Sequence, residues 1–226
     1  MTLMALTLDL DDTLWPVWPA IERAESLLWQ WLHQHAPATA AVHDTRTLRT
    51  LRNEVERAHP EWQHDLSRIR RESIRLALQQ QGEDPALADA AFEVFFAARQ
   101  QVELYADVLP ALDRLAARWP ILALSNGNAD VQRVGLGRYF AGSLSAREFG
   151  IGKPEPAIFH AACERLGATP DQVLHIGDDV ALDIDGALQA GLRAAWVRRA
   201  DSAAQPQRAP HHTVADLLAL AEALGA

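Results

Sequence analysis

The chain opens with Leu3-Met4-Ala5-Leu6-Thr7-Leu8-Asp9-Leu10-Asp11-Asp12-Thr13, a short apolar run that ends in acidic residues. A run of this length and composition predicts a buried strand of a parallel sheet. Because alternate side chains of a strand point to opposite faces, Asp9 and Asp11 are expected on one side and Leu10 on the other. The stretch therefore predicts two carboxylates at the carboxyl end of the first strand.

Further apolar runs alternate with helical patterns along the rest of the chain. Strands are expected at residues 121–124, 142–146, 173–176 and 194–197, and helices at residues 108–118, 129–136, 154–166, 181–190 and 213–224. Gly167 and Gly191 follow two of these helices, where a left-handed cap is common. The alternation predicts an α/β fold, a doubly wound parallel sheet with helices on both faces.

Residues 15–107 interrupt this alternation. They contain no convincing strand, but they do contain apolar residues at helical spacing and a helix expected at residues 65–81. We therefore expect a helical domain, residues 15–107, inserted into a sheet domain made of residues 1–14 and 108–226.

Composition excludes several classes of protein. The 226 residues are 49% hydrophobic and 23% charged, which is typical of globular proteins and not of disordered ones. The formal net charge of -9 favours neither nucleic acid nor an anionic membrane as a partner. A single cysteine, an amino-terminal segment without a cationic start and the lack of a long apolar run predict a cytoplasmic protein.

Polar residues that suit phosphate binding follow the later strands. Ser125-Asn126-Gly127 comes directly after the strand expected at residues 121–124. Lys153 precedes Pro154, which is expected to begin a helix. A hydroxyl, an amide and an ammonium group near strand ends and a helix start predict a site for an anion.

More acidic residues follow the strand expected at residues 173–176. They lie in His175-Ile176-Gly177-Asp178-Asp179 and at Asp183. Crowded carboxylates repel one another and require a cation or a shared proton. Oxygen ligands of this kind suit a hard divalent ion, and magnesium is the expected cofactor.

In these motifs the chain resembles the haloacid dehalogenase superfamily of hydrolases. The four signature elements occur in order along the chain: Asp9-x-Asp11-x-Thr13, Ser125, Lys153-Pro154, and Gly177-Asp178-Asp179 with Asp183. The resemblance implies a Rossmann-like core with an inserted helical cap, and a magnesium-dependent phosphatase acting on a small phosphorylated metabolite.

The resemblance also implies a role for each motif residue. Asp9 would be the nucleophile that forms an aspartyl phosphate, and Asp11 the general acid and then base. Magnesium would be held by Asp9, the backbone carbonyl of Asp11, and Asp178, with Asp183 or Asp179 orienting metal-bound water and Asp183 favoured. Catalytic Lys153 would neutralise charge, and the substrate would be bound by Thr13, Ser125 and Asn126.

Two tryptophans follow the first motif. Trp15 and Trp18 lie where the chain leaves for the helical domain. They fit two interpretations equally well, a packed hinge or an aromatic wall that binds the leaving group of the substrate.

Other functions share part of this pattern. A 2-haloacid dehalogenase uses the same nucleophile, but it needs neither Asp11 nor the acidic cluster, and a phosphosugar mutase shares the motifs. A non-catalytic binding protein is disfavoured because no motif residue is missing. Three stretches, residues 125–129, 135–140 and 175–179, resemble the branch that contains a riboflavin-pathway phosphatase, which implies a flavin-pathway phosphate as substrate. The sequence does not indicate an oligomeric state.

Overall fold

The computed structural model describes residues 2–199 and 205–226. They form two compact units. The sheet unit contains Met1–Pro16 and Glu103–Ala226, and the helical unit contains Val17–Val102. No helix of the described residues is both long and apolar enough to cross a membrane.

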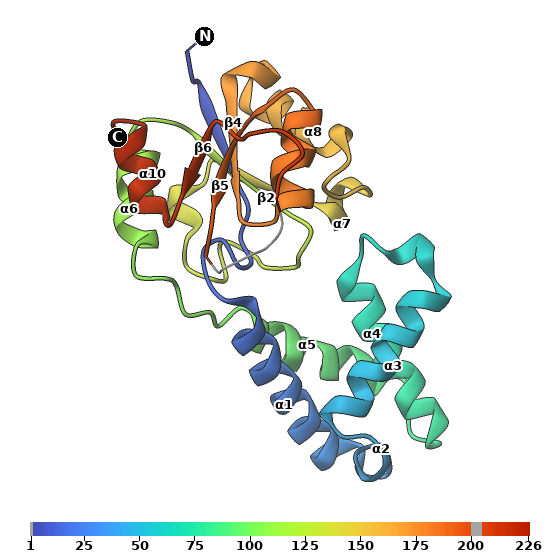
Figure 1. Cartoon of the computed structure of the whole chain (residues 1–226). Coiled ribbons are helices and arrows are strands. Elements are labelled where there is room, and N and C mark those ends of the chain that lie inside the picture. The colour runs from blue at the N-terminus through green and yellow to red at the C-terminus, as the bar shows by residue number, and fades with distance from the viewer. Residues whose placement is uncertain (1, 200–204) are drawn as a thin grey trace. The chain divides into compact units, whose positions relative to one another are not determined.

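A six-stranded sheet forms the centre of the sheet unit (Figure 1). All neighbouring strands are parallel, in the order β3-β2-β1-β4-β5-β6. The strands are β1 Ala5–Leu8, β2 Ile121–Ser125, β3 Gly142–Ser145, β4 Val173–Gly177, β5 Arg193–Val197 and β6 His212–Val214. The strand order reverses between β1 and β4, which is where open sheets of this kind bind ligands. The predicted doubly wound α/β fold is confirmed.

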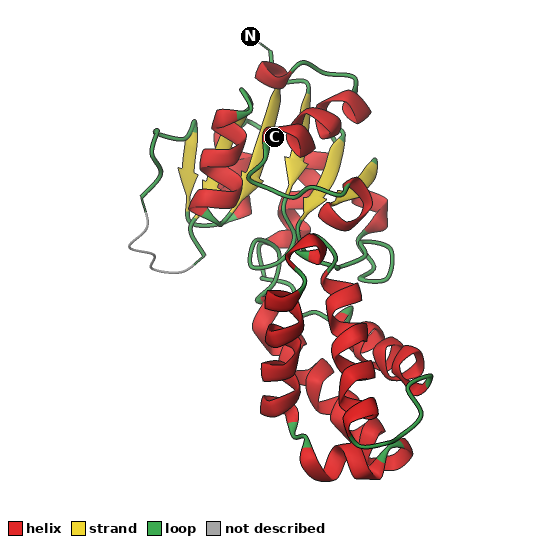
Figure 2. Ribbon diagram, turned by 90° about the vertical axis from the view of Figure 1, so that its right-hand side faces the viewer, coloured by secondary structure: helices red, strands yellow, loops and turns green. Residues whose placement is uncertain are grey.

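Helices cover both faces of this sheet (Figure 2). α6 (Val108–Ala116) and α10 (Leu217–Ala223) pack together on one face. α8 (Pro156–Leu166), a π-helical turn at Val180–Asp185 and α9 (Gly186–Gln189) cover the other, where apolar side chains of the strands and of α8 form a core. The shorter elements are α7 (Ala146–Phe149) and single 3-10 turns at Gly137–Tyr139 and Pro170–Gln172.

Three helices expected from the sequence differ in the structure. Residues 131–135 form a turn, and the helix expected at 129–136 is absent, because Gly135 adopts a left-handed φ of 89°. The helix expected at 213–224 begins only at Leu217, after the edge strand β6, where the Asp216 side chain accepts a hydrogen bond from Ala219 N. α8 begins at Pro156 and not at Pro154.

The helical unit is built from five helices among the described residues. They are α1 Val17–His35, α2 Pro37–Val42, α3 Thr45–Ala58, α4 Leu66–Gln80 and α5 Leu87–Arg99, with a 3-10 turn at Pro60–Trp62. Their apolar faces meet in a separate core that includes Leu28, Ile74 and Phe95. Each unit therefore has its own hydrophobic core, as expected of a domain.

Both connections to the helical unit start within the sheet unit. The backbone N–H of Tyr105 donates a 3.0 Å hydrogen bond to the carbonyl of Leu14. Trp15, Pro16 and residues 103–107 are thus grouped with the sheet, whereas the sequence places the boundaries after residue 14 and before residue 108. The action of the helical unit as a cap stays a prediction.

Candidate active site

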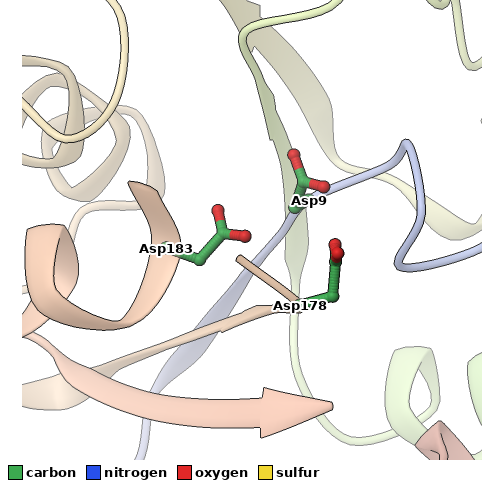
Figure 3. Close-up of side chains that lie close together, drawn as sticks. All are labelled: Asp9, Asp178 and Asp183. Atoms are coloured by element: carbon green, nitrogen blue, oxygen red, sulfur yellow. The ribbon is translucent and has the colours of Figure 1, made fainter. Parts of the chain in front are cut away.

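Three carboxylates converge at the carboxyl ends of β1 and β4. Asp9, Asp178 and Asp183 each offer an oxygen, and these oxygens lie within 4.8 Å of one another (Figure 3). Asp9 follows β1, Asp178 follows β4, and Asp183 lies on the π-helical turn behind β4. The parallel pairing of β1 with β4 extends to Asp9, whose N–H donates a 2.9 Å hydrogen bond to Ile176 O. Acids far apart in the sequence are therefore brought together at the switch point of the sheet.

Lys153 is buried against two of these acids. Its Nζ lies 2.5 Å from Asp9 Oδ1 and 2.6 Å from Asp183 Oδ1. Burial acts to lower the pKa of Lys153, but Asp183 and Asp9 outweigh burial and raise it, so the ammonium stays charged. One buried cation thus faces three carboxylates.

The Asn126 side chain fixes the backbone of Lys153. Its Nδ2 donates to Lys153 O and its Oδ1 accepts from Lys153 N, both at 2.8 Å. This reciprocal pair holds Lys153 in a loop before α8. Asn126, expected as a substrate ligand, lines the site and positions Lys153.

Lys153 is the only lysine of the sequence, and all the other basic residues apart from histidine are arginines. An ammonium group is a compact point charge, whereas a guanidinium is a broad planar fork. A single lysine that is fully buried between two carboxylates therefore indicates a requirement for the smaller cation. The composition of the chain already contained this signal, which motif matching does not use.

Asp183 has both carboxylate oxygens engaged by the protein. Oδ1 accepts from Lys153 and from His175 Nε2 (3.1 Å), and Oδ2 accepts from the backbone N–H of Asp179 (3.0 Å). Burial acts to raise the pKa of Asp183, but Lys153 and the His175 contact lower it, so this carboxyl stays ionised. These bonds suit Asp183 to positioning its neighbours more than to binding a metal directly.

His175 completes this buried chain of hydrogen bonds. Its Nδ1 lies 2.8 Å from Thr7 Oγ1, and burial lowers its pKa. The interpretation of His175 as a hydrogen-bonded core residue agrees with these contacts. Gly177 is required beside it, because a Cβ at that position would lie 2.4 Å from Asp183 Oδ2.

Asp178 faces Asp9 across the opening of the cluster. Thr13 Oγ1 donates to Asp178 Oδ1 at 2.6 Å and, at 3.3 Å, to Asp9 Oδ2. Burial raises the pKa of Asp178 to about 7, and burial also raises that of Asp9. Carboxylates that are buried with too little positive charge, and that offer only oxygen atoms, fit a hard divalent cation such as magnesium.

Asp11 is held by Trp15. The indole Nε1 of Trp15 donates a 2.9 Å hydrogen bond to Asp11 Oδ1, and Trp15 is fully buried. The turn between them places Asp12 at a left-handed φ of 59°. Trp15 therefore acts as a packed residue that orients Asp11, which favours the hinge interpretation over an aromatic wall.

The remaining expected residues are distributed as follows. Ser125 lines the site, and its Oγ accepts from Gly127 N at 3.0 Å. Asp179 Oδ1 caps the following turn by accepting from Ala181 N and Leu182 N, so Asp183 and not Asp179 joins the cluster. Trp18 lies in the helical unit under the guanidinium of Arg49, and its part in substrate binding stays a prediction.

A cavity of about 180 Å³ opens onto these groups. It is lined by Asp9, Asp11, Asp12, Ser125, Asn126, Gly127, Lys153, Asp178, Asp179, Leu182 and Asp183. Its volume is small compared with ligand pockets of about 300 Å³ or more that hold whole organic molecules. The cavity suits a phosphate-sized group and a cation.

Sequence motifs did not identify Arg199 and Asp107, an ion pair that is hydrogen-bonded to the backbone of the first motif at Thr13. Arg199 donates to both carboxylate oxygens of Asp107, at 2.7 and 2.9 Å, and its Nε donates to the carbonyl of Thr13 at 3.0 Å. Arg199 follows the carboxyl end of β5, and this position relative to the sheet is the signal that could have indicated it.

The chain matches known proteins over most of its length. A profile of the haloacid dehalogenase-like hydrolases matches residues 3–191. The chain belongs to this family. It is 36% identical over 198 residues to the 5-amino-6-(5-phospho-D-ribitylamino)uracil phosphatase YigB of Escherichia coli, covering 86% of this chain and 83% of that protein.

A second relative is also a phosphatase. The phosphoserine phosphatase of Thermus thermophilus is 37% identical over 164 residues, covering 69% of this chain and 66% of that protein. The expected membership of the superfamily and the phosphatase class are supported by both relatives.

Solved structures of the family share the fold. A structure described as a 2-haloacid dehalogenase from Pseudomonas syringae pv. Tomato has a TM-score of 0.92 and 38% identity, with 99% of each chain covered. The L-2-haloacid dehalogenase of Xanthobacter autotrophicus has a TM-score of 0.68 and 22% identity over 99% of each chain, which shows the fold alone. Fold similarity therefore does not by itself separate the two chemistries.

Proposed function

We propose that this protein is a magnesium-dependent phosphomonoesterase that hydrolyses a small phosphorylated metabolite through an aspartyl phosphate on Asp9. The observation that carries the proposal is the convergence of Asp9, Asp178 and Asp183 around Lys153, with Asp11 held beside them. A dianionic phosphate can approach a carboxylate nucleophile only where positive charge offsets their repulsion.

Asp9 is the nucleophile of the proposed reaction. Its Oδ1 is bound to Lys153 and its Oδ2 lies within reach of the Thr13 hydroxyl, so the orientation of the carboxylate is fixed. Attack on phosphorus forms an acyl phosphate and releases the alcohol. Lys153 stabilises the ionised carboxylate before attack.

Asp11 is the general acid and then the general base. It donates a proton to the departing alkoxide, and then accepts one from the water that cleaves the acyl phosphate. The hydrogen bond from Trp15 restricts its side chain to one orientation. This role needs an acid beside the nucleophile, and Asp11 lines the same cavity as Asp9.

The proposed cofactor is magnesium. Asp9, Asp178 and the backbone carbonyl of Asp11 would hold it, and Asp183 would orient its surroundings. Bound there, magnesium supplies the positive charge that polarises the phosphoryl group. Asp12, Ser125 and Asn126 complete the wall of the cavity.

The proposed substrate class is a flavin-pathway phosphate. Support comes from the 36% identity to a relative named for a ribitylamino-uracil phosphate. Dehalogenation of a 2-haloacid is the second candidate, because a structure with 38% identity carries that description. The acidic cluster and Asp11 favour the phosphatase.

The test is release of inorganic phosphate from a panel of phosphomonoesters by metal-stripped protein, with and without added magnesium. The panel includes flavin mononucleotide and phosphoserine, and chloride release from 2-chloropropionate is measured in parallel. We expect phosphate release only with magnesium. Metal-independent chloride release would favour the dehalogenase, and isomerisation without phosphate release would favour a mutase.

Asp9→Asn tests the nucleophile. Because the amide cannot attack phosphorus, we expect turnover to fall by about 10⁴-fold or more with the fold unchanged. Asp171→Asn, at a surface turn of the same unit, is the matched control and should keep wild-type turnover. Normal turnover in Asp9→Asn would remove the proposed mechanism.

A further inference from the structure

A second cavity adjoins the candidate active site. Its volume is about 600 Å³, and it shares three lining residues with the catalytic cavity: Asp12, Asp178 and Asp179. The two cavities therefore meet at the edge of the acidic cluster. A volume of this size holds a whole small organic molecule, whereas the catalytic cavity does not.

Aromatic and basic residues line this second cavity beside the shared acids and Asp185. Its lining includes Tyr105, Trp196, Arg198 and Arg199. Arg199 lies over the Tyr105 ring at 4.3 Å, and its donors already bind Asp107 and Thr13. The hydrogen-bond donors of Arg199 are thus used within the protein and not for a ligand.

Arg198 differs from its neighbour. It is exposed, its guanidinium lies 5.0 Å from the centre of the Trp196 ring, and within residues 2–199 and 205–226 it forms no ion pair with an acid. Trp196 is fixed in turn, because its Nε1 donates a 3.0 Å hydrogen bond to Asp178 O. A guanidinium that stacks on an indole and pairs with no described acid is suited to oxygen acceptors, and most strongly to anionic ones.

We propose that this cavity is the leaving-group subsite, and that Arg198 is a specificity residue for phosphomonoesters whose distal end carries oxygen acceptors. The inference rests on the proposed phosphatase function, because the adjoining catalytic cavity must take the phosphate. Two sources share this chemistry, a carboxylate and the carbonyl oxygens of a heterocyclic ring. The subsite selects between substrates and leaves the reacting atoms to the acidic cluster.

The test compares three substrates in two variants. Flavin mononucleotide carries ring carbonyls, phosphoserine carries a carboxylate, and phenyl phosphate carries neither. Arg198→Met keeps an unbranched apolar side chain and removes the donors, and Arg198→Lys keeps the charge without the planar fork. Arg147→Met removes an exposed guanidinium that does not line the cavity, and is the control.

In Arg198→Met we expect KM for flavin mononucleotide, phosphoserine or both to rise about tenfold, the loss expected for a partly exposed charged hydrogen bond. KM for phenyl phosphate should stay within about twofold. The substrate that responds identifies the source of the acceptor. Unchanged KM for both acceptor-bearing substrates, or an equal rise with phenyl phosphate, would overturn the subsite while the phosphatase function stands.

A binding measurement separates this proposal from failure of the proposed function. If wild-type protein hydrolyses none of the three, the wider panel decides the phosphatase proposal, and calorimetric binding decides the subsite. Flavin mononucleotide or phosphoserine should bind Asp9→Asn about tenfold more tightly than Asp9→Asn with Arg198→Met. Equal affinities, or no binding to either protein, would overturn it.

Discussion

A buried cluster of charged side chains occurs in the helical unit and another in the sheet unit, and the two clusters differ in their balance of charge. In the helical unit Glu25 accepts hydrogen bonds from Arg70 Nη2 and Arg49 Nε, both at 3.1 Å. In the sheet unit Asp9, Asp178 and Asp183 share one lysine, Lys153, among the described residues. The first cluster has a surplus of positive charge and its acid is fully bonded. The second has a surplus of acid, which supports the proposed binding of a cation there and not in the helical unit.

Of the variants considered, Lys153→Met should have the largest effect on the acidic cluster, because it removes the only positive charge that the cluster's carboxylates contact among the described residues. The variant leaves three carboxylates without their cation, so we expect turnover to fall about 10³-fold or more, and metal-free protein to lose about 3–5 kcal/mol of unfolding free energy at pH 8. Phosphate release and urea denaturation measure the two effects.

Lys153→Arg sharpens this result. If charge alone matters, arginine restores both properties. We expect it to restore stability in part and turnover hardly at all, because the planar fork does not fit where the ammonium contacts two oxygens at 2.5 and 2.6 Å. Full activity in Lys153→Arg would contradict the requirement for a compact cation.

Glu25→Gln should destabilise the cluster of the helical unit without changing the catalytic residues. Two arginines would lose their acid, and we expect the unfolding free energy to fall by about 2–4 kcal/mol, less than for a fully buried pair because Arg49 is 36% exposed. Thermal and urea denaturation measure the loss. Glu22→Gln, at an exposed position of the same helix, should change stability by less than about 0.5 kcal/mol. A restored stability on addition of magnesium would show that the clusters do not differ as described.

Sequence patterns predicted the part of the site that depends on strand order. Asp9 and Asp178 follow adjacent parallel strands, and parallel strands bring their carboxyl ends to one edge. The resemblance implied different roles for Asp178 and Asp183, but strand order alone does not distinguish them, because the difference depends on which carboxylate oxygens the protein's own donors occupy.

Other features could not be predicted from the sequence, because no local sequence pattern encodes them. Arg199 and Asp107 are 92 residues apart and pair only through the packing of β5 beside the chain's return from the helical unit. The turn at residues 131–135 keeps a helical pattern of apolar residues, but Gly135 at a left-handed φ ends it. Tertiary contacts and backbone geometry decided both cases.

Asp178 should make the stability of metal-free protein depend on pH. Burial raises its pKa to about 7, against about 3.9 in an unfolded chain. Between these values the folded protein binds a proton that the unfolded chain has lost. The contribution of Asp178 to stability is therefore full below about pH 4 and is lost as the pH rises to about 7.

The measurement is urea denaturation of wild type and Asp178→Asn from pH 5 to pH 8. Relative to the variant, metal-free wild type should lose about 1–3 kcal/mol across this range, the smaller values reflecting partial exposure. Magnesium should restore the loss in wild type only, with sodium chloride at equal ionic strength as the control. A difference that stays constant with pH would contradict the assignment.

Trp15→Phe is expected to have the smallest effect and to test how Asp11 is held. The phenyl ring fills most of the same buried volume, but it cannot donate to Asp11. We expect kcat to fall about 3–10-fold for an alkyl phosphate, whose leaving group needs a proton, and less for 4-nitrophenyl phosphate, whose leaving group does not. Trp119→Phe is the matched control, because it removes an indole hydrogen bond to the carbonyl of Leu3 in the same unit, away from the site. An equal loss for both substrates in Trp15→Phe, or the same loss in Trp119→Phe, would mean that Trp15 supports packing alone and that Asp11 finds its orientation without it.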